Sequence, residues 1–211
     1  SGRTSTGARA AQSHTGAMAG SDDAYGAAFR KCGALRVASV AEMVDACKAL
    51  AAFPKARGLG KRVAVVTNSG GPGVLTADRL AQLGLDAAAP GEALKTGLRA
   101  VLPPLSGLSN PIDVTVEGSA EHYGAALDLC LPAFDAAVVI YVGTPYLAAL
   151  PVAEAVASAA KKHNKPVLAQ FAVGTDIDLA LAALERTNVP CFPSGECAAV
   201  GLSALCHDTG A

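Results

Sequence analysis

The stretch Thr67-Asn68-Ser69-Gly70-Gly71-Pro72-Gly73-Val74 decides how the rest of the chain is interpreted. It follows a mostly apolar run, residues 62–66, and it precedes apolar residues that recur at three-residue steps from Val74 to Leu83. This order predicts a buried strand, then a glycine-rich turn, then a helix. The glycines would let the backbone adopt positive φ and approach a ligand closely, and a proline is tolerated in the first helical turn.

The predicted turn has the features of an anion site. Free N–H groups and the positive end of a helix dipole would converge there, which favours a phosphoryl group. A tight turn whose glycines serve only packing explains the same stretch. It is not a P-loop, because no Lys-Ser or Lys-Thr pair follows the glycines. The residues expected to bind phosphate are Asn68, Ser69, Gly70, Gly71, Gly73 and Val74.

Composition excludes several classes of function. Hydrophobic residues make up 51% of the 211 residues, enough for a full core, and the net charge of −1 gives no sign of nucleic-acid or membrane binding. No apolar run reaches membrane-spanning length and no signal peptide opens the chain. The six cysteines show no CxxC spacing, which favours free thiols in the cytoplasm. The low aromatic content, 4%, argues against a flavodoxin-type FMN carrier, since a flavin needs rings to stack on.

From Lys61 onward, strand and helix patterns alternate. Strands are expected at 62–67, 85–88, 112–116, 136–142, 167–171 and 189–192. Helices are expected near 73–83, 92–101, 119–131, 147–162, 176–186 and 195–206. The alternation predicts an α/β fold with a flavodoxin-like, doubly wound parallel sheet, whose ligands bind beyond the carboxyl ends of the strands.

The first part of the chain is expected to be a partial α/β domain. Residues 1–20 lack periodicity and predict a loop. Helices are expected from Ser21 to about Lys31 and after Ser39, with a short strand at 35–37 between them. Residues 54–60 are expected to be a linker.

His14 lies among small residues of the predicted loop. A neutral imidazole there could act as a nucleophile, base or metal ligand, or it could simply bond to the backbone. The remaining histidines are isolated and not spaced as ligand sets, so no metal site is expected. The sequence Asn110-Pro111-Ile112-Asp113 is more typical of a turn before a strand than of a catalytic motif, although it could line a ligand site.

Four stretches in order resemble the nucleoside-diphosphate-forming acyl-CoA synthetases, which include ADP-forming acetate–CoA ligase and are related to succinyl-CoA synthetase. They are Gly7 to Gly20 around Ser13-His14-Thr15, Asp22 to Val40, Val66 to Val74, and Asn110 to Val114. The resemblance implies that 1–58 is the C-terminal part of the phosphohistidine-bearing CoA-ligase domain. Residues 61–206 would be the flavodoxin-like CoA-ligase domain.

The resemblance also implies a reaction. Acid, CoA and ATP would be interconverted with acyl-CoA, ADP and phosphate through an acyl phosphate and a phosphohistidine on His14, and the glycine turn would hold the phosphoryl group. CoA, ATP or ADP, and Mg²⁺ would bind to CoA-binding and ATP-grasp domains that this stretch lacks, so the stretch alone is expected to be inactive. A homo-oligomer is compatible with the family. The alternative is a non-catalytic, ligand-sensing module fused to another enzyme such as an acetyltransferase.

Overall fold

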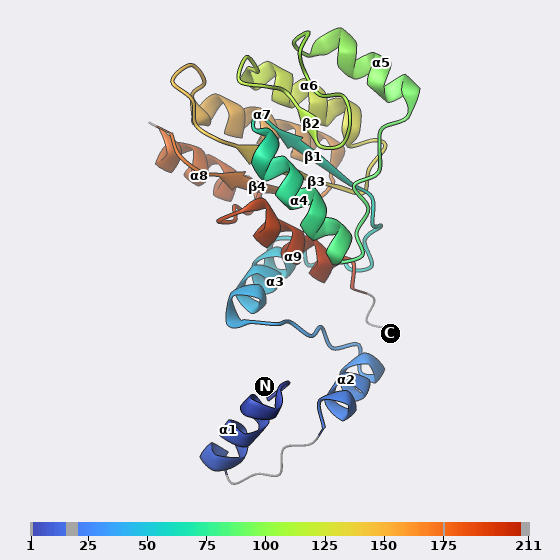
Figure 1. Cartoon of the computed structure of the whole chain (residues 1–211). Coiled ribbons are helices and arrows are strands. Elements are labelled where there is room, and N and C mark those ends of the chain that lie inside the picture. The colour runs from blue at the N-terminus through green and yellow to red at the C-terminus, as the bar shows by residue number, and fades with distance from the viewer. Residues whose placement is uncertain (1, 16–20, 175, 208–211) are drawn as a thin grey trace. The chain divides into compact units, whose positions relative to one another are not determined.

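The computed structural model describes residues 2–15, 21–174 and 176–207, which belong to two compact units. One unit comprises residues 1–38 with 208–211, and the other comprises residues 39–207. Figure 1 shows the course of the chain.

The first unit contains two helices, α1 (Ser5–Thr15) and α2 (Asp22–Lys31). The expectation of a loop over residues 1–20 is therefore wrong for residues 5–15. An alanine-rich sequence favours the helix, and the Thr4 hydroxyl accepts the Gly7 N–H at 3.1 Å, which caps its first turn. The start of α2 is as predicted, since the Ser21 hydroxyl accepts the Ala24 N–H at 3.2 Å.

The strand expected at 35–37 does not form. No other strand lies among the described residues of this unit, so a strand there would have no ladder partner. The segment is held by side chains instead. Arg36 pairs with the Asp22 carboxylate, and the Arg3 guanidinium donates to the Val37 carbonyl at 2.7 Å.

The second unit is built on a parallel sheet with the order β2-β1-β3-β4. Its strands are β1 (Val63–Thr67), β2 (Ile112–Asp113), β3 (Ala136–Tyr141) and β4 (Val167–Phe171). Cys191 forms a parallel bridge to Ala169 beyond β4 and so takes the place of a fifth strand. The resulting order, 2-1-3-4-5, is the flavodoxin-like order that the alternation predicts.

Two expected strands are reduced to single bridges. Residues 85–88 contribute one bridge, Asp86 to Arg62, and residues 189–192 contribute the bridge at Cys191. Beside β1, the Asn110 side chain occupies the next ladder position, since its Oδ1 accepts the Val65 N–H at 2.9 Å and its Nδ2 donates to the Val63 carbonyl at 2.7 Å. An amide side chain thus replaces strand backbone, which leaves no edge for 85–88 to extend along.

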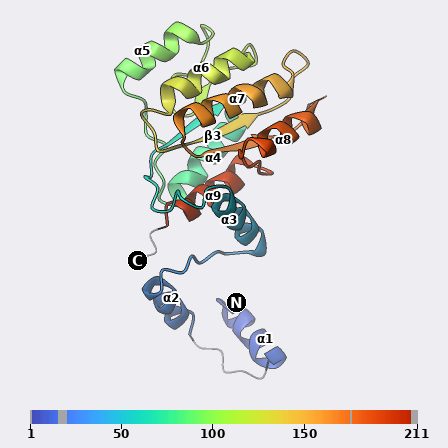
Figure 2. The ribbon, with the colours of Figure 1, turned by 180° about the vertical axis from the view of Figure 1, so that it is seen from behind.

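Helices cover both faces of the sheet. Helices α4 (Gly70–Gln82), α9 (Gly195–Leu205) and α3 (Val40–Ala52) pack on the face formed by side chains such as Val65, Val138 and Leu168 (Figure 1). Helices α5 (Glu92–Val101), α6 (Ala120–Cys130), α7 (Ala149–His163) and α8 (Ile177–Arg186) cover the other face, as seen from behind (Figure 2). The strands are buried on both faces, as the continuous apolar runs predict.

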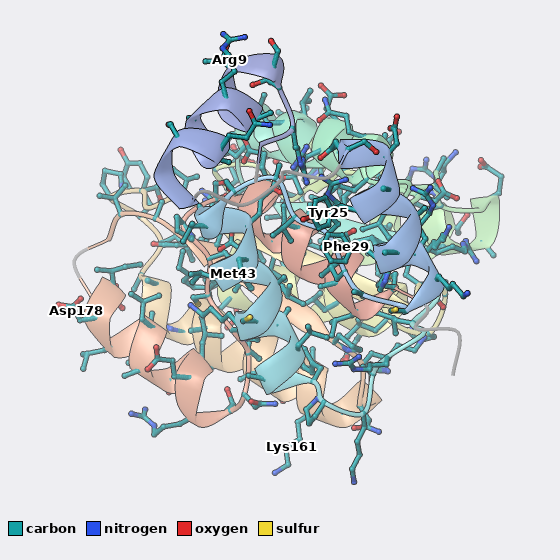
Figure 3. All side chains as sticks on the ribbon, turned by 90° about the horizontal axis from the view of Figure 1, so that it is seen from below. Arg9, Tyr25, Phe29, Met43, Lys161 and Asp178 are labelled. Atoms are coloured by element: carbon teal, nitrogen blue, oxygen red, sulfur yellow. The ribbon has the colours of Figure 1, made fainter. Side chains whose placement is uncertain are left out.

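Helix α3 packs on α9, and by its contacts it belongs with the sheet, in the compact unit that begins at Ser39. The predicted domain limits instead group α3 with the N-terminal residues, and those limits stay a prediction. Met43 lies on the outer side of α3 (Figure 3). Within the described residues, no helix is long and apolar enough to cross a membrane.

Candidate functional site

The turn that leads from β1 into α4 is held in place by Thr67. Its buried hydroxyl accepts the Ser69 N–H at 2.9 Å and donates to the Ser69 carbonyl at 2.8 Å. Ser69 is the N-cap residue of α4, but its own side chain makes no capping bond. The turn is therefore fixed from the strand side, and the start of the helix keeps its backbone donors uncapped.

The glycines of this turn are helical. Among the described residues, the glycines with positive φ are Gly2, Gly33, Gly58 and Gly84, so the expectation of positive φ in the turn is wrong. The fold instead requires a glycine for packing at Gly73, where a Cβ would lie 3.0 Å from Thr67 Cγ2 and 3.3 Å from Pro111 Cβ. A Cβ on Gly71 would meet no atom within 4 Å.

Two backbone donors are open at the start of α4. The N–H groups of Gly70 and Gly71 have no acceptor among the described residues, and both glycines are exposed. Pro72 has no N–H, and the Gly73 N–H donates to the Ser69 carbonyl at 3.3 Å. The N–H of Val74 is committed inside the helix, to the carbonyl four residues back. Of the six residues predicted to bind phosphate, only Gly70 and Gly71 thus have a free backbone N–H among the residues described.

Asn68 supports this loop through its side chain. Its Nδ2 donates to the Val142 carbonyl at 2.9 Å, and its Oδ1 accepts the Val142 N–H at 2.9 Å. These bonds join the ends of β1 and β3, which are neighbours at the switch point of the sheet. The Asn68 side chain is only 4% exposed, and both its polar ends are used within the protein.

Asp113 is the residue that sequence reasoning left undecided. It ends β2, beside Thr67 of β1, and its Oδ2 lies 3.6 Å from the position a Cβ would take on Gly70. Its Oδ1 accepts the Thr115 N–H at 2.8 Å, and Thr115 has a φ of 62°. The order of β1 and β2 in the sheet brings this carboxylate to the start of α4, and no local pattern around residues 110–113 indicates that.

The predicted site residue His14 lies in the last turn of α1, not in a loop. Its side chain is outside the described residues. Two other histidines have structural partners. His122 Nδ1 accepts the Ser119 N–H at 2.9 Å in a capping box, and His163 Nε2 lies 2.8 Å from Asp128 Oδ1.

The described part of the chain could hold a metal ion or offer a reactive thiol mainly through its His, Cys, Asp and Glu side chains. Its His, Cys, Asp and Glu residues form no group of three that could hold a metal ion. All six cysteines are free thiols. Burial raises the pKa of Cys130 and Cys191 to about 12, which makes them poor nucleophiles.

The sheet order and the open helix start define a flavodoxin-like α/β domain, and comparison with known proteins shows its family. Residues 63–205 match the family described as "Ligase-CoA domain", and residues 1–50 match the family "Succinyl-CoA ligase like flavodoxin domain". The chain belongs to the Ligase-CoA domain family. The resemblance to nucleoside-diphosphate-forming acyl-CoA synthetases is thereby confirmed.

The relatives are ADP-forming ligases. The alpha subunits of acetate–CoA ligase [ADP-forming] II and I of Pyrococcus furiosus are 37% and 35% identical, each over 97% of this chain. A solved structure, "dinucleotide forming Acetyl-coenzyme A synthetase 1 in complex with phosphate and ADP" from Ca. Korarchaeum cryptofilum, superposes with a TM-score of 0.84 at 34% identity over 97% of this chain. The chain spans 45%, 44% and 44% of these three proteins.

Proposed function

We propose that this chain is part of an ADP-forming acyl-CoA synthetase, which interconverts acid, CoA and ATP with acyl-CoA, ADP and phosphate. The observation that carries the proposal is the pair of open N–H groups at Gly70 and Gly71, on the first turn of a helix in a CoA-ligase domain. Family membership and the ligase names of its relatives support the reaction class.

The reaction proceeds by three transfers. Phosphate attacks the thioester carbonyl of acyl-CoA, so that the C–S bond breaks and acyl phosphate and CoA form. A nitrogen of His14 then attacks the phosphorus of acyl phosphate, which releases the carboxylate and leaves phosphohistidine. Finally, a terminal phosphate oxygen of ADP attacks that phosphorus, which gives ATP and frees the imidazole. The reverse sequence makes acyl-CoA at the expense of ATP.

The start of α4 is suited to a phosphoryl group in transit. The helix dipole favours a negative charge there by about 0.3–1 kcal/mol, and up to about 2 kcal/mol in a partly buried site. Each N–H donated to an anionic oxygen adds a charge-assisted bond. Because Gly70 and Gly71 have no side chain, a bulky phosphoryl carrier can approach both donors.

The remaining substrates bind to parts of the enzyme outside the residues described. We place CoA, ATP and ADP on CoA-binding and ATP-grasp domains, which supply the parts of a full turnover that this stretch lacks. Magnesium would accompany the nucleotide there, because it binds mainly through the phosphates of its substrate and one or two carboxylates. Besides those domains, the partners we propose are the small-molecule substrates carboxylic acid, CoA and phosphate, and a homo-oligomer is compatible with the family. The free thiols favour a location in the reducing cytoplasm.

The experiment that tests this function uses the full-length enzyme and labelled ATP with magnesium. Wild-type enzyme should acquire phosphate that is labile in acid and stable in base, as expected of phosphohistidine. His14→Ala should acquire none. His163→Gln is the matched control, because His163 is a histidine with a structural partner, and it should label normally.

Equal labelling of the His14→Ala and wild-type enzymes would remove His14 from the mechanism. A wild-type enzyme that never labels, yet binds an acyl-CoA, would favour the ligand-sensing module instead. The ligase names of the relatives favour the enzyme.

A further inference from the structure

Helix α3 has an apolar face that the described residues leave uncovered. Four side chains recur on it at steps of three and four residues: Val40, Met43, Val44 and Cys47. This spacing puts all four on one side of the helix, the outer face of α3. Val40 is 72% exposed and Val44 is 57% exposed, and Met43 lies on the outer side of the helix (Figure 3). The opposite side, where Ala49 is fully buried, packs on α9. Helix α3 is therefore apolar on two opposite faces, and the residues described cover only one of them.

Polar bonds at both ends hold α3 in this orientation. Near its start, the Arg79 guanidinium of α4 binds the Glu42 carboxylate at 2.7 Å, and both side chains are largely withdrawn from water. At its end, Asn188 Nδ2 donates to the Ala52 carbonyl at 2.6 Å. A rotation that turned the outer face inward would break these bonds. The outer face of α3 therefore stays directed away from its own domain.

The family matches indicate which structure covers this face. The match to "Succinyl-CoA ligase like flavodoxin domain" spans residues 1–50 and includes all four side chains of the outer face, whereas the match to "Ligase-CoA domain" begins only at residue 63. A flavodoxin-like domain packs its helices on a β-sheet. The described residues of the first match, 2–15 and 21–50, form no strand. A sheet of that domain would therefore come from residues outside those described.

We propose that the outer face of α3 packs on the β-sheet of the succinyl-CoA ligase-like flavodoxin domain in the full-length protein. Two relatives have the length for such a sheet, since this chain spans 45% and 44% of them. A parallel sheet that is covered by helices presents Val, Ile and Leu side chains, which suit an apolar helix face. Helix α3 would then be shared by two domains, with α9 on one side and the sheet on the other. The inference does not depend on the reaction proposed above.

The first test measures how fast Cys47 reacts with a maleimide, in this chain and in the full-length protein, with the modified peptides identified by mass spectrometry. In this chain Cys47 is exposed and should react rapidly. In the full-length protein it should react at least about tenfold more slowly, because a thiol in a packed interface is reached only when the interface opens. The matched control is Lys161→Cys, at an exposed position on α7 (Figure 3), which should react equally in both proteins.

Equal reactivity of Cys47 in the two proteins would overturn the proposal. Protection of Cys47 in this chain alone, increasing with its concentration, would also overturn it, because a second copy would then be the occupant. Photo-methionine at position 43 of the full-length protein identifies the occupant directly. Its cross-links should join Met43 to strands of the flavodoxin-like domain, and cross-links to a nucleotide-binding domain instead would show that the assigned partner is wrong.

A variant separates docking from folding. Val44→Glu should change the melting temperature of this chain by less than about 2 °C, because the side chain is exposed there. In the full-length protein it should raise the reactivity of Cys47 about tenfold, toward that of this chain, since an unpaired carboxylate is costly in an apolar interface. Leu105→Glu, the same kind of exchange at a leucine that is 80% exposed, should leave Cys47 protected. Continued protection of Cys47 in Val44→Glu would count against the docking face.

Discussion

Helices α4 and α7 of the same domain differ in what accepts the backbone N–H groups at their N-termini. Neither has a side-chain bond from its own N-cap residue, Ser69 or Ala148. The start of α7 is occupied by the Asp176 carboxylate, whose two oxygens accept the N–H groups of Ala149 and Leu150 at 2.9 and 2.8 Å. The corresponding donors of α4 are open among the residues described.

The comparison shows what an anion at such a helix start requires. At α7 the chain supplies its own carboxylate, which lies 26–27 residues away in sequence and binds two consecutive N–H groups. At α4 two consecutive donors, on Gly70 and Gly71, have the same position in the helix and lack a bound oxygen. The free carboxylate of Asp113 lies close by without bonding to them. We infer that the start of α7 has a structural role alone, whereas the start of α4 is available to bind a ligand.

The largest effect should come from removing one open donor. Gly70→Pro deletes the N–H at the first helical position, where proline fits well, and Ser69 before it already has the extended conformation that precedes proline (φ −143°, ψ 117°). The fold should keep its stability or gain about 0.4–1 kcal/mol. Phosphorylation of His14 in the full-length enzyme should slow by about 10²–10³-fold, the usual effect of losing one such donor.

Gly70→Ala is the control for this variant, because it adds a Cβ and keeps the N–H. Its Cβ would lie 3.6 Å from Asp113 Oδ2, an ordinary contact. Quenched-flow labelling of His14 compares the three enzymes. Equal rates for wild type, Gly70→Pro and Gly70→Ala would show that the N–H takes no part in phosphotransfer, and α4 would then differ from α7 only in lacking a cap.

A second prediction compares two glycines of the turn: Gly73, which is closely packed, and Gly71, which faces open space. Gly73→Ala should lower the free energy of unfolding by about 1–3 kcal/mol, because its Cβ presses on Thr67 and Pro111. Gly71→Ala should leave stability unchanged or raise it by about 0.5–1 kcal/mol, since it enters open space and favours the helix. Urea unfolding of the two variants measures the difference. If both variants lose stability equally, the packing assigned to Gly73 is wrong.

The sequence predicts elements better than it predicts contacts. The helix at 92–101 is found at the expected limits, and the alternation of patterns predicts the sheet order. These features depend on local periodicity, which the sequence carries directly. The helix at 5–15 is not indicated by periodicity, because its segment has no apolar residues larger than alanine to form a stripe, although Thr4 is a capping signal for it.

The failures at the site have a different cause. The glycines suggested positive φ, but Gly73 is required by the approach of Thr67 and Pro111 from other elements. Asn68 looks like a ligand in sequence, and its amide is used by Val142, which is 74 residues away. Such partners are set by the tertiary fold and leave no local pattern to read.

The smallest expected effect concerns the start of α7, whose first two N–H groups are bound by Asp176. The N–H groups of Leu150 and Ala149 lower the pKa of Asp176 below its ordinary value of 3.8. A carboxyl group whose pKa is lower in the folded state stabilises the fold above its unfolded pKa, and that stabilisation disappears as the pH falls through the folded pKa. Asp176→Asn should therefore reduce the melting temperature slightly near neutral pH, and wild type and variant should converge as the pH falls below about 3.8.

Melting curves across this acidic range, measured for wild type, Asp176→Asn and Asp178→Asn, test the point. Asp178 lies in the first turn of α8 but accepts no hydrogen bond from the described residues, so its variant should differ from wild type less than Asp176→Asn does. Added phosphate provides the link to α4. It should raise the melting temperature of wild type and of Asp176→Asn by the same amount, because the anion binds at the other helix. If phosphate raises the melting temperature of Asp176→Asn alone, it replaces the lost carboxylate at α7. The start of α4 would then not be the phosphate-binding site.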